Sequence, residues 1–367
     1  MKLSFLDPVY ARPGPYACAY LDTSTDVDDP RKAVELRWRH LRDDLRSQGA
    51  DPAAITAAAA AVGCDLEVSG RHGQAIVAAQ DRLALVEELA EPPARDSARY
   101  GPLPDMMRLA IAHAPDIPYV AVLVIRSQRG ATRQAETCID VEVETGRWPT
   151  SAASPGLRCR WQLQAAQWRS RAAEVVAQLE DLAGAHGSEM IVLAGDMWAR
   201  RDLLHQLPRV LRAATVEADA EFAGTAGGRA LLEDTLRDVF HGRLGHRDRT
   251  MVNVFLAQRA RHPQAVEGMA ATVAALRRGQ AQALLVNPPA AFTRPLWVGP
   301  EPTHLALTAQ DLRSIGVGHP REEPADAALI RATVGTGAEL VAAPPDVVTL
   351  AGGVGVLPRY VDASAAA

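Results

Sequence analysis

The chain has 367 residues, enough for two or three domains of ordinary size. Hydrophobic residues make up 48% and charged residues 23%, as in a folded globular protein, and the net charge of −5 argues against binding nucleic acid by general electrostatics. No apolar run approaches the ~20 residues that span a bilayer, and the first residues lack a signal-peptide core. We therefore expect a cytoplasmic protein that does not enter a membrane.

The first third of the chain, residues 1–113, predicts an α/β domain. A strand with alternating burial is expected at Tyr16–Leu21, followed by two helices. Gly70–Gln74 contains two glycines and is expected to be the turn between strands at 65–69 and 75–79.

The middle third, residues 114–249, begins with the continuously apolar run Tyr119–Ile125, which is typical of a strand buried on both faces. A meander followed by alternating helix and strand predicts a mixed sheet of the ribonuclease-H-like type. The expected elements are strands at 119–125, 132–135, 137–143 and 190–195 and a long helix at 163–183.

The last third, residues 250–367, predicts a small α-β-α sandwich. Pro358 should shorten or kink the final strand. The expected elements are helices at 251–261, 264–278, 325–334 and 345–350 and strands at 281–286, 295–298, 339–342 and 354–357.

One local positive segment stands out in this acidic chain. Residues 147–171 contain five arginines and no acidic residue. Arginine forks match phosphate oxygens and indole rings stack on bases, so a segment of this composition is suited to RNA. Trp161 and Trp168 are seven residues apart, and core packing on one helical face explains them equally well. The candidate RNA contacts here are Arg147, Trp148, Arg158, Arg160 and Trp161.

A second group of candidate RNA contacts lies in the expected N-terminal turn, at Arg71, His72 and Gln74. A plain turn with two glycines also explains these residues without any function.

The chain offers little evidence for metal chemistry. Asp140, Glu142, Glu174 and Asp196 could form the carboxylate cluster of a nuclease, but isolated acids on strands and helices are commonplace. The four cysteines form no Cys-X-X-Cys pair, and the histidines lack metal-ligand spacing. We therefore expect no metal and no cofactor.

Four motifs occur in an order that points to a known family. Tyr20-Leu-Asp-Thr23 lies at the end of the first expected strand, and Val192-Leu-Ala-Gly-Asp196 ends a central one. Ala275-Leu-Arg-Arg-Gly279 precedes Ala283-Leu-Leu-Val286, and Gly352-Gly-Val-Gly-Val-Leu-Pro-Arg-Tyr360 closes the last domain. Together they resemble the archaeal and eukaryotic class-I peptide-chain release factor and Pelota, and especially bacterial relatives such as the Balon-like hibernation factors.

The resemblance implies three α/β domains: a release-factor-like N-terminal domain at 1–113, a ribonuclease-H-like central domain at 114–249, and a kink-turn-binding type of sandwich at 250–367. It also implies that the protein binds the A site of the ribosome and contacts rRNA, with a translational GTPase as a further partner and no role for DNA. The N-terminal domain would approach the decoding centre and the central domain the peptidyl-transferase centre.

One family motif is absent. Relatives that hydrolyse peptidyl-tRNA carry Gly-Gly-Gln between the central strands and the long helix, which we expect at 144–161, where Pro149 and Pro155 stand instead. Hydrolysis needs a flexible loop that places a backbone N–H against the developing oxyanion. We therefore expect no catalytic residue, and a hibernation or stress factor that occupies the A site. The alternatives are a peptidyl-tRNA hydrolase that uses Gln162 or Gln164, or a stress-linked scaffold that binds a protein partner through its acidic surface.

Overall fold

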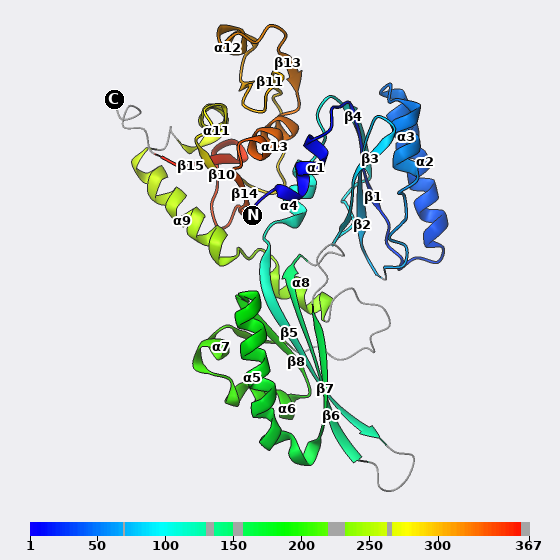
Figure 1. The fold of residues 1–367 in the computed structure, drawn as a ribbon, viewed down its shortest axis with the longest axis vertical. Helices are drawn as coiled ribbons and strands as arrows, with labels where there is room; N and C mark the ends of the chain where they lie inside the picture. Colours follow the sequence, from blue (N-terminus) through cyan, green and yellow to red (C-terminus); the bar gives the residue numbers. More distant parts are fainter. Residues whose placement is uncertain (69, 130–135, 150–156, 219–231, 263–265, 361–367) are drawn as a thin grey trace. The chain divides into compact units, whose positions relative to one another are not determined.

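In the computed structural model, the chain forms two compact units, one of residues 1–67, 71–115 and 247–367, the other of 68–70 and 116–246. The predicted N- and C-terminal domains therefore lie together in one unit, and the predicted central domain is the other. No helix in the described part of the chain is both long and apolar enough to cross a bilayer. The structure describes all residues except 69, 130–135, 150–156, 219–231, 263–265 and 361–367 (Figure 1).

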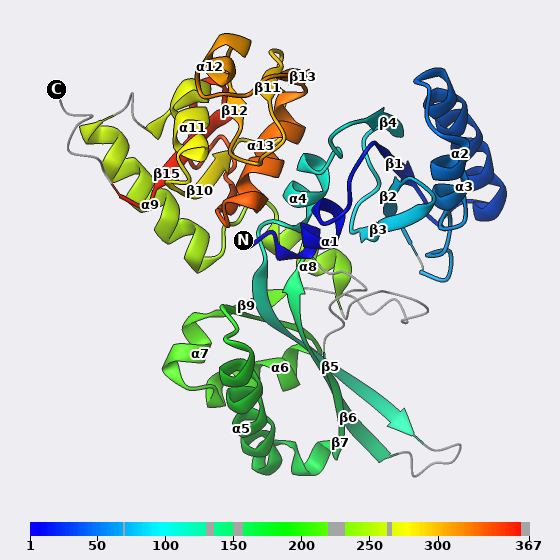
Figure 2. The ribbon, with the colours of Figure 1, turned by 45° about the horizontal axis from the view of Figure 1, so that its top comes forward.

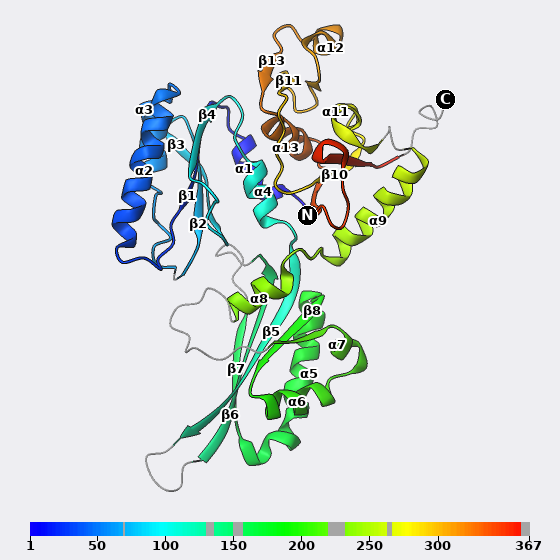
Figure 3. The same cartoon turned by 180° about the vertical axis from the view of Figure 1, so that it is seen from behind.

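The N-terminal part of the first unit is an antiparallel sheet with two helices on one face, as Figure 3 shows. Its strands are arranged in the order β3-β2-β1-β4. Alternate residues of β1 divide between two cores: Ala17 and Ala19 pack under the helices, while Cys18 and Tyr20 face the other way. The elements are η1 Ser4–Leu6, α1 Asp7–Tyr10, β1 Tyr16–Asp22, α2 Pro30–Ser47, α3 Pro52–Ala59, β2 Gly73–Ala79, β3 Arg82–Leu89, β4 Ser97–Gly101 and α4 Met107–His113.

Both covering helices begin as the sequence indicates. Asp29 accepts a hydrogen bond from the Lys32 N–H at 3.1 Å to cap α2, and Asp51 accepts one from the Ala53 N–H at 2.9 Å to cap α3. A proline follows each cap, where its missing N–H is not needed.

The C-terminal part contains two three-stranded sheets, β14-β10-β15 and β12-β11-β13. Figure 2 shows the second of these beside α12. The sequence missed the short β12, β13 and α12, which are at most six residues long. The elements are α9 His246–Arg261, α11 Gly268–Arg277, β10 Ala281–Val286, β11 Leu296–Val298, β12 Leu305–Ala306, α12 Ala309–Ser314, β13 Arg321–Glu323, α13 Ala325–Gly335, β14 Glu339–Ala342, η3 Ala351–Gly353 and β15 Val354–Pro358.

The predicted helix at 345–350 is wrong, because a turn occupies part of this segment. Asn287, which follows β10, holds the segment with its side chain: it donates to the carbonyls of Ala343 and Val348 at 2.8 Å and accepts from the Leu350 N–H at 2.9 Å. These side-chain bonds satisfy backbone groups that a helix would otherwise pair. The last strand is not shortened as expected: it includes Pro358, and its pairing with β10 has a register shift between Ala281 and Ala283.

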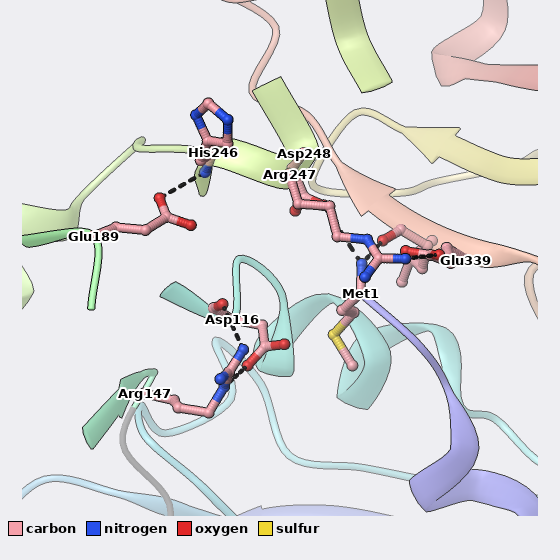
Figure 4. A network of polar contacts seen from close by, with 9 residues as sticks. Met1, Asp116, Arg147, Glu189, His246, Arg247, Asp248 and Glu339 are labelled. Atoms are coloured by element: carbon pink, nitrogen blue, oxygen red, sulfur yellow. Dashed lines mark hydrogen bonds and ion pairs between the residues drawn. The ribbon is translucent and has the colours of Figure 1, made fainter. Parts of the chain in front are cut away.

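The two parts of this unit share a continuous core and an edge. The second face of the N-terminal sheet packs in the same core as α13 and β10. Met1 lies beside β14: its carbonyl accepts from the Leu340 N–H at 2.9 Å, and its ammonium nitrogen lies 3.5 Å from Asp248 (Figure 4). Arg247, at the start of α9, pairs with Glu339 of β14.

The second unit contains a five-stranded sheet in the order β7-β6-β5-β8-β9. The first three strands pair antiparallel and the last two pair parallel, which confirms the predicted mixed sheet. Its elements are β5 Ile117–Arg129, β6 Glu136–Trp148, β7 Arg158–Gln164, η2 Ala165–Gln167, α5 Trp168–His186, β8 Met190–Gly195, α6 Met197–Gln206, α7 Arg209–Ala213, β9 Thr215–Ala218 and α8 Glu233–Phe240. The strand predicted at 132–135 lies outside the described residues.

Alternate residues of β5 pack against different helices. Val120, Val122 and Val124 contact the core formed with α5 and α6, whereas Tyr119 and Leu123 belong to the core that includes α8. Burial on both faces explains why this strand is continuously apolar in the sequence.

Gly195 fixes the junction between β8 and α6. Its φ is +106°, and a Cβ on it would lie 1.9 Å from the Val124 carbonyl oxygen. The next residue, Asp196, donates its N–H to that same carbonyl at 2.7 Å and accepts from the Ala199 N–H at 2.9 Å to cap α6. The Gly-Asp pair thus directs α6 away from the end of the sheet.

Gly195→Ala should lower the free energy of unfolding by about 2–4 kcal/mol. The strain of a left-handed backbone at alanine and the clash of its Cβ with Val124 both destabilise the folded state. Gly184→Ala is the matched control: it lies in α5, a Cβ added there would have nothing within 4 Å, and the change should be neutral or stabilising. Urea unfolding of both variants checks this. Equal effects of the two changes would contradict the close-approach explanation.

Asp105, between β4 and α4, is buried. Burial raises the pKa of the Asp105 carboxyl, Arg99 lowers it, and Asp326 raises it again. The Arg99 guanidinium also lies 3.7 Å from the carboxylate of Asp326 in α13. The charge of one guanidinium therefore acts on two carboxylates, those of Asp105 and Asp326.

Asp105→Asn should raise the thermal midpoint at neutral pH and have little effect near pH 4. A carboxyl whose folded pKa is raised favours folding when protonated, so its ionisation removes stability as pH increases from about 3.9 through the folded pKa. Thermal unfolding of both proteins from pH 4 to 8 measures the difference, with the exposed Asp346→Asn as control. If Asp105→Asn raised the thermal midpoint equally at all pH values, ionisation of Asp105 would not be the cause of the stabilisation.

Candidate nucleic-acid interface

The arginines predicted in a loop at 144–161 are mostly on strands. β6 continues to Trp148, and β7 begins at Arg158. Arg158 and Arg160 therefore lie on the edge strand of the central sheet, directly opposite Glu144 and Glu142 of β6. The loop prediction was wrong for these residues because the third strand of the meander begins earlier than its apolar content indicates.

The cross-strand carboxylates offset this positive charge. Arg158 Nε lies 2.6 Å from Glu144 Oε2, and Tyr119 donates its hydroxyl to the other oxygen of Glu144 at 3.2 Å. Burial raises the pKa of Tyr119, and the charge of Glu144 raises it further, so the hydroxyl remains a donor. The Glu144 side chain is only 5% exposed, whereas that of Arg158 is 57% exposed. Arg158 is thus tied to a buried acid while part of its guanidinium faces solvent.

Arg160 is held more loosely. Its guanidinium lies 3.5 Å from Glu142 and 3.6 Å from Asp140, beyond ideal hydrogen-bond distance. Asp140 in turn accepts from the Ser127 hydroxyl at 2.8 Å. Arg160 is more than half exposed, and it can turn toward a phosphate at the expense of a weak ion pair.

Arg147 and Trp148 lie at the end of β6 and not at a loop tip. Arg147 donates from Nε to Asp116 at 2.5 Å, and this bond raises the pKa of the guanidinium (Figure 4). Trp148 is buried, with its ring stacked on Phe240 of α8 at a centroid distance of 5.8 Å. Trp148 is therefore a core residue in this structure, and Arg147 anchors the strand end.

Trp161 and the β7 arginines face opposite sides of the strand. Trp161 packs partly buried against the core under α5, in the same row as Leu163. Trp168 is fully buried in that core. An RNA strand on the arginine face would therefore not reach the Trp161 ring.

The N-terminal candidates are held inside the first unit. The expected hairpin at Gly70–Gln74 is absent: the segment before it forms turns, and β2 makes its tight turn to β3 at Gln80. Gln74 is buried and donates to the Ala61 carbonyl at 3.0 Å. His72 is buried with its ring 3.6 Å from Asp65, which accepts from the Thr23 hydroxyl at 2.7 Å. Of the three candidates, only Arg71 is exposed.

Part of the connection expected at 144–161, residues 150–156, lies outside the described residues, and β7 stands between that segment and the long helix. η2, Ala165–Gln167, joins β7 directly to α5. It contains no glycine, and its final residue Gln167 is exposed, as are Gln162 and Gln164 of β7. The sequence reasoning missed Gln167 because the helix was expected to start at Leu163.

The carboxylates considered for a nuclease do not converge. Asp196 caps α6, and Glu174 pairs with Arg171 on α5 at 2.8 Å. Asp140 and Glu142 are engaged with Arg160. Within the described ranges, no group of three or more His, Cys, Asp or Glu side chains is placed to hold a metal ion.

The sequence reasoning also missed an exposed aromatic residue beside an arginine. Trp198, in the first turn of α6, lies under the guanidinium of Arg126 on β5, at 5.9 Å from the ring centroid. A signal was present: Met197 and Trp198 follow the helix cap, outside the apolar face formed by Ala199 and Leu203.

Comparison with known proteins finds a family that resembles the central region of the chain. Residues 118–261 match the model of the bacterial archaeo-eukaryotic release factor family 2. Two proteins of Mycobacterium tuberculosis, Uncharacterized protein MT2704 of strain CDC 1551 / Oshkosh and Uncharacterized protein Rv2629 of strain ATCC 25618 / H37Rv, are each 27% identical over 98% of this chain and 97% of their own length.

Solved structures of translation factors are also similar, at low sequence identity. The archaeal translation termination factor aRF1 matches 97% of this chain and 96% of its own, with 12% identity and a TM-score of 0.23. The archaeal Pelota in a ribosome-bound model with ABCE1 matches 98% of this chain and 94% of its own, with 13% identity and a TM-score of 0.37. Because these scores are low, we rely on the family match of the central region. Over residues 118–261 the chain is therefore similar to the bacterial archaeo-eukaryotic release factor family 2.

Proposed function

We propose that the protein is a ribosome-binding factor that occupies the A site of idle ribosomes without hydrolysing peptidyl-tRNA, and so acts in hibernation or stress. Its kinship with release factors supports the ribosome as partner. The proposed absence of hydrolysis is inferred from the segment Ala165–Gln167, which connects β7 to α5. This segment is a single 3-10 turn and contains no glycine. Without glycine the backbone has less freedom to place an N–H group against an oxyanion.

Ribosome binding by this protein depends on local contacts and shape, because the net charge is −5. Arg160 is the β7 arginine best suited to such a contact, since its ion pairs are long and its side chain is exposed. The proposal includes rRNA as the surface contacted, a translational GTPase as a delivery partner, and the cytoplasm as location.

Purified protein should sediment with vacant ribosomes, and Arg160→Ala should weaken this binding several-fold and reduce the slope of log affinity against log salt by about 1. Arg160 is 58% exposed and its two contacts are long, and the buried Asp140 keeps its hydrogen bond from Ser127, so the variant should fold normally. Co-sedimentation across a salt series measures both quantities.

Arg171→Ala is the matched control, because Arg171 is also an exposed arginine with an acidic partner in the central unit. We expect it to bind ribosomes as the unmodified protein does. Absence of sedimentation at every salt concentration would overturn the proposed function and favour a scaffold that binds a protein. Binding that is unchanged by Arg160→Ala would exclude this arginine from the contact.

A peptidyl-tRNA hydrolase is the second candidate, because three exposed glutamines lie at the end of β7 and in η2. We expect no release of peptide from stalled ribosome complexes above the rate without protein. Single alanine variants of Gln162, Gln164 and Gln167 provide the comparison. Release by the unmodified protein that one of these variants abolishes would establish hydrolysis and refute the non-catalytic role.

A further inference from the structure

Trp198 occupies an exposed position on the central unit that folding does not require. Its side chain is 40% exposed, and its neighbour Met197 is 76% exposed. α6 packs on the sheet through Ala199 and Leu203, which are fully buried. Large apolar side chains left in solvent beside a charged residue are a feature of binding sites.

The orientation of Trp198 is fixed by its surroundings. Gly195 and the Asp196 cap determine where α6 begins, so the first turn cannot rotate freely. The Arg126 guanidinium lies 5.9 Å from the centre of the indole ring, within the range of a cation–π contact. This pair places a planar cation over one face of the aromatic ring.

Two arginines around this ring carry positive charge that no described carboxylate offsets. Arg126 and Arg201 are both exposed, and in the described ranges neither has an acidic group within the 4.0 Å of an ion pair. Arg201 lies three residues after Trp198, and therefore on the same side of α6. The nearby Asp202 is 3.3 Å from Arg169. The arginines of β7, in contrast, face carboxylates of β6.

We propose that Arg126, Met197, Trp198 and Arg201, called here the Trp198 surface, bind single-stranded RNA. A base stacks on the indole ring, and phosphates bind the two guanidinium groups. Stacking tolerates any base, because every base has a π-face. RNA is favoured over an acidic protein because a carboxylate-rich partner would use the arginines but leave the indole face without a planar group to stack on.

The Trp198 surface would give the proposed ribosome binding an RNA contact in the central domain, and in this respect it rests on the proposed function. Binding of RNA to the isolated protein does not depend on that function. The two can therefore be tested separately.

The test uses the full chain and a fluorescein-labelled uridine 20-mer, with binding followed by fluorescence anisotropy. Trp198→Ala should weaken binding roughly 5- to 100-fold, the range for loss of one stacked base, and Trp198→Phe should retain most of the affinity. The double variant Arg126→Ala, Arg201→Ala should reduce the salt slope by about 1.4, from about 0.7 per phosphate contact on a single strand.

Arg82→Ala is the control for charge, since Arg82 is an exposed arginine in the other unit. It should bind RNA as the unmodified protein does. No measurable binding of the 20-mer, or equal affinity of Trp198→Ala and the unmodified protein, would overturn the inference. So would polyglutamate binding as tightly as RNA with no dependence on Trp198, because that result identifies an acidic protein as the partner.

Ribosome sedimentation separates this inference from the proposed function. If the protein does not sediment with ribosomes but Trp198→Ala still weakens binding to the 20-mer, the proposed function fails and the RNA site stands. If the protein sediments with ribosomes and Trp198→Ala leaves affinity for the 20-mer unchanged, the function stands and the RNA site fails.

Discussion

The pairing of β7 with β6 decides which charges the central unit presents on that part of its sheet. Arg158 lies opposite Glu144 and Arg160 opposite Glu142, so each arginine meets a carboxylate across the strands. Such cross-strand pairs stabilise a sheet, but they also neutralise part of the charge that a phosphate would need. The arginines of β7 therefore act mainly in strand pairing. Arg160 has the longer ion-pair contacts, so it can more easily turn to bind a phosphate.

Charge pairing is equally important in the other unit, where the N-terminal sheet and the C-terminal part share one core. Arg99 lies between Asp326 and the buried Asp105, and Met1 joins the edge of β14 while its ammonium group faces Asp248. These contacts between segments far apart in sequence bind the first and last thirds of the chain into one body. Burial of the Asp105 carboxylate costs free energy that the charge of Arg99 offsets only in part.

For function, the geometry that matters is the end of the central sheet where β7 meets α5 and β8 meets α6. A three-residue connection without glycine precedes α5, and the Gly195–Asp196 junction sets the start of α6 and thereby the position of Trp198. Both helices therefore start at this end of the sheet, each shortly after a strand.

The sequence by itself determined most of the longer elements, the mixed central sheet and the resemblance to release factors, because apolar periodicity and short motifs are local properties. It predicted a strand at Tyr16–Leu21 followed by two helices, and these elements are present as β1, α2 and α3. Only the tertiary structure decided which charges are free. Trp148 stacks on Phe240, ninety-two positions later in the chain, His72 lies beside Asp65, and the arginines of β7 meet the acids of β6. Exposure and charge pairing depend on which distant segments come together, and a segment's own composition does not contain that information.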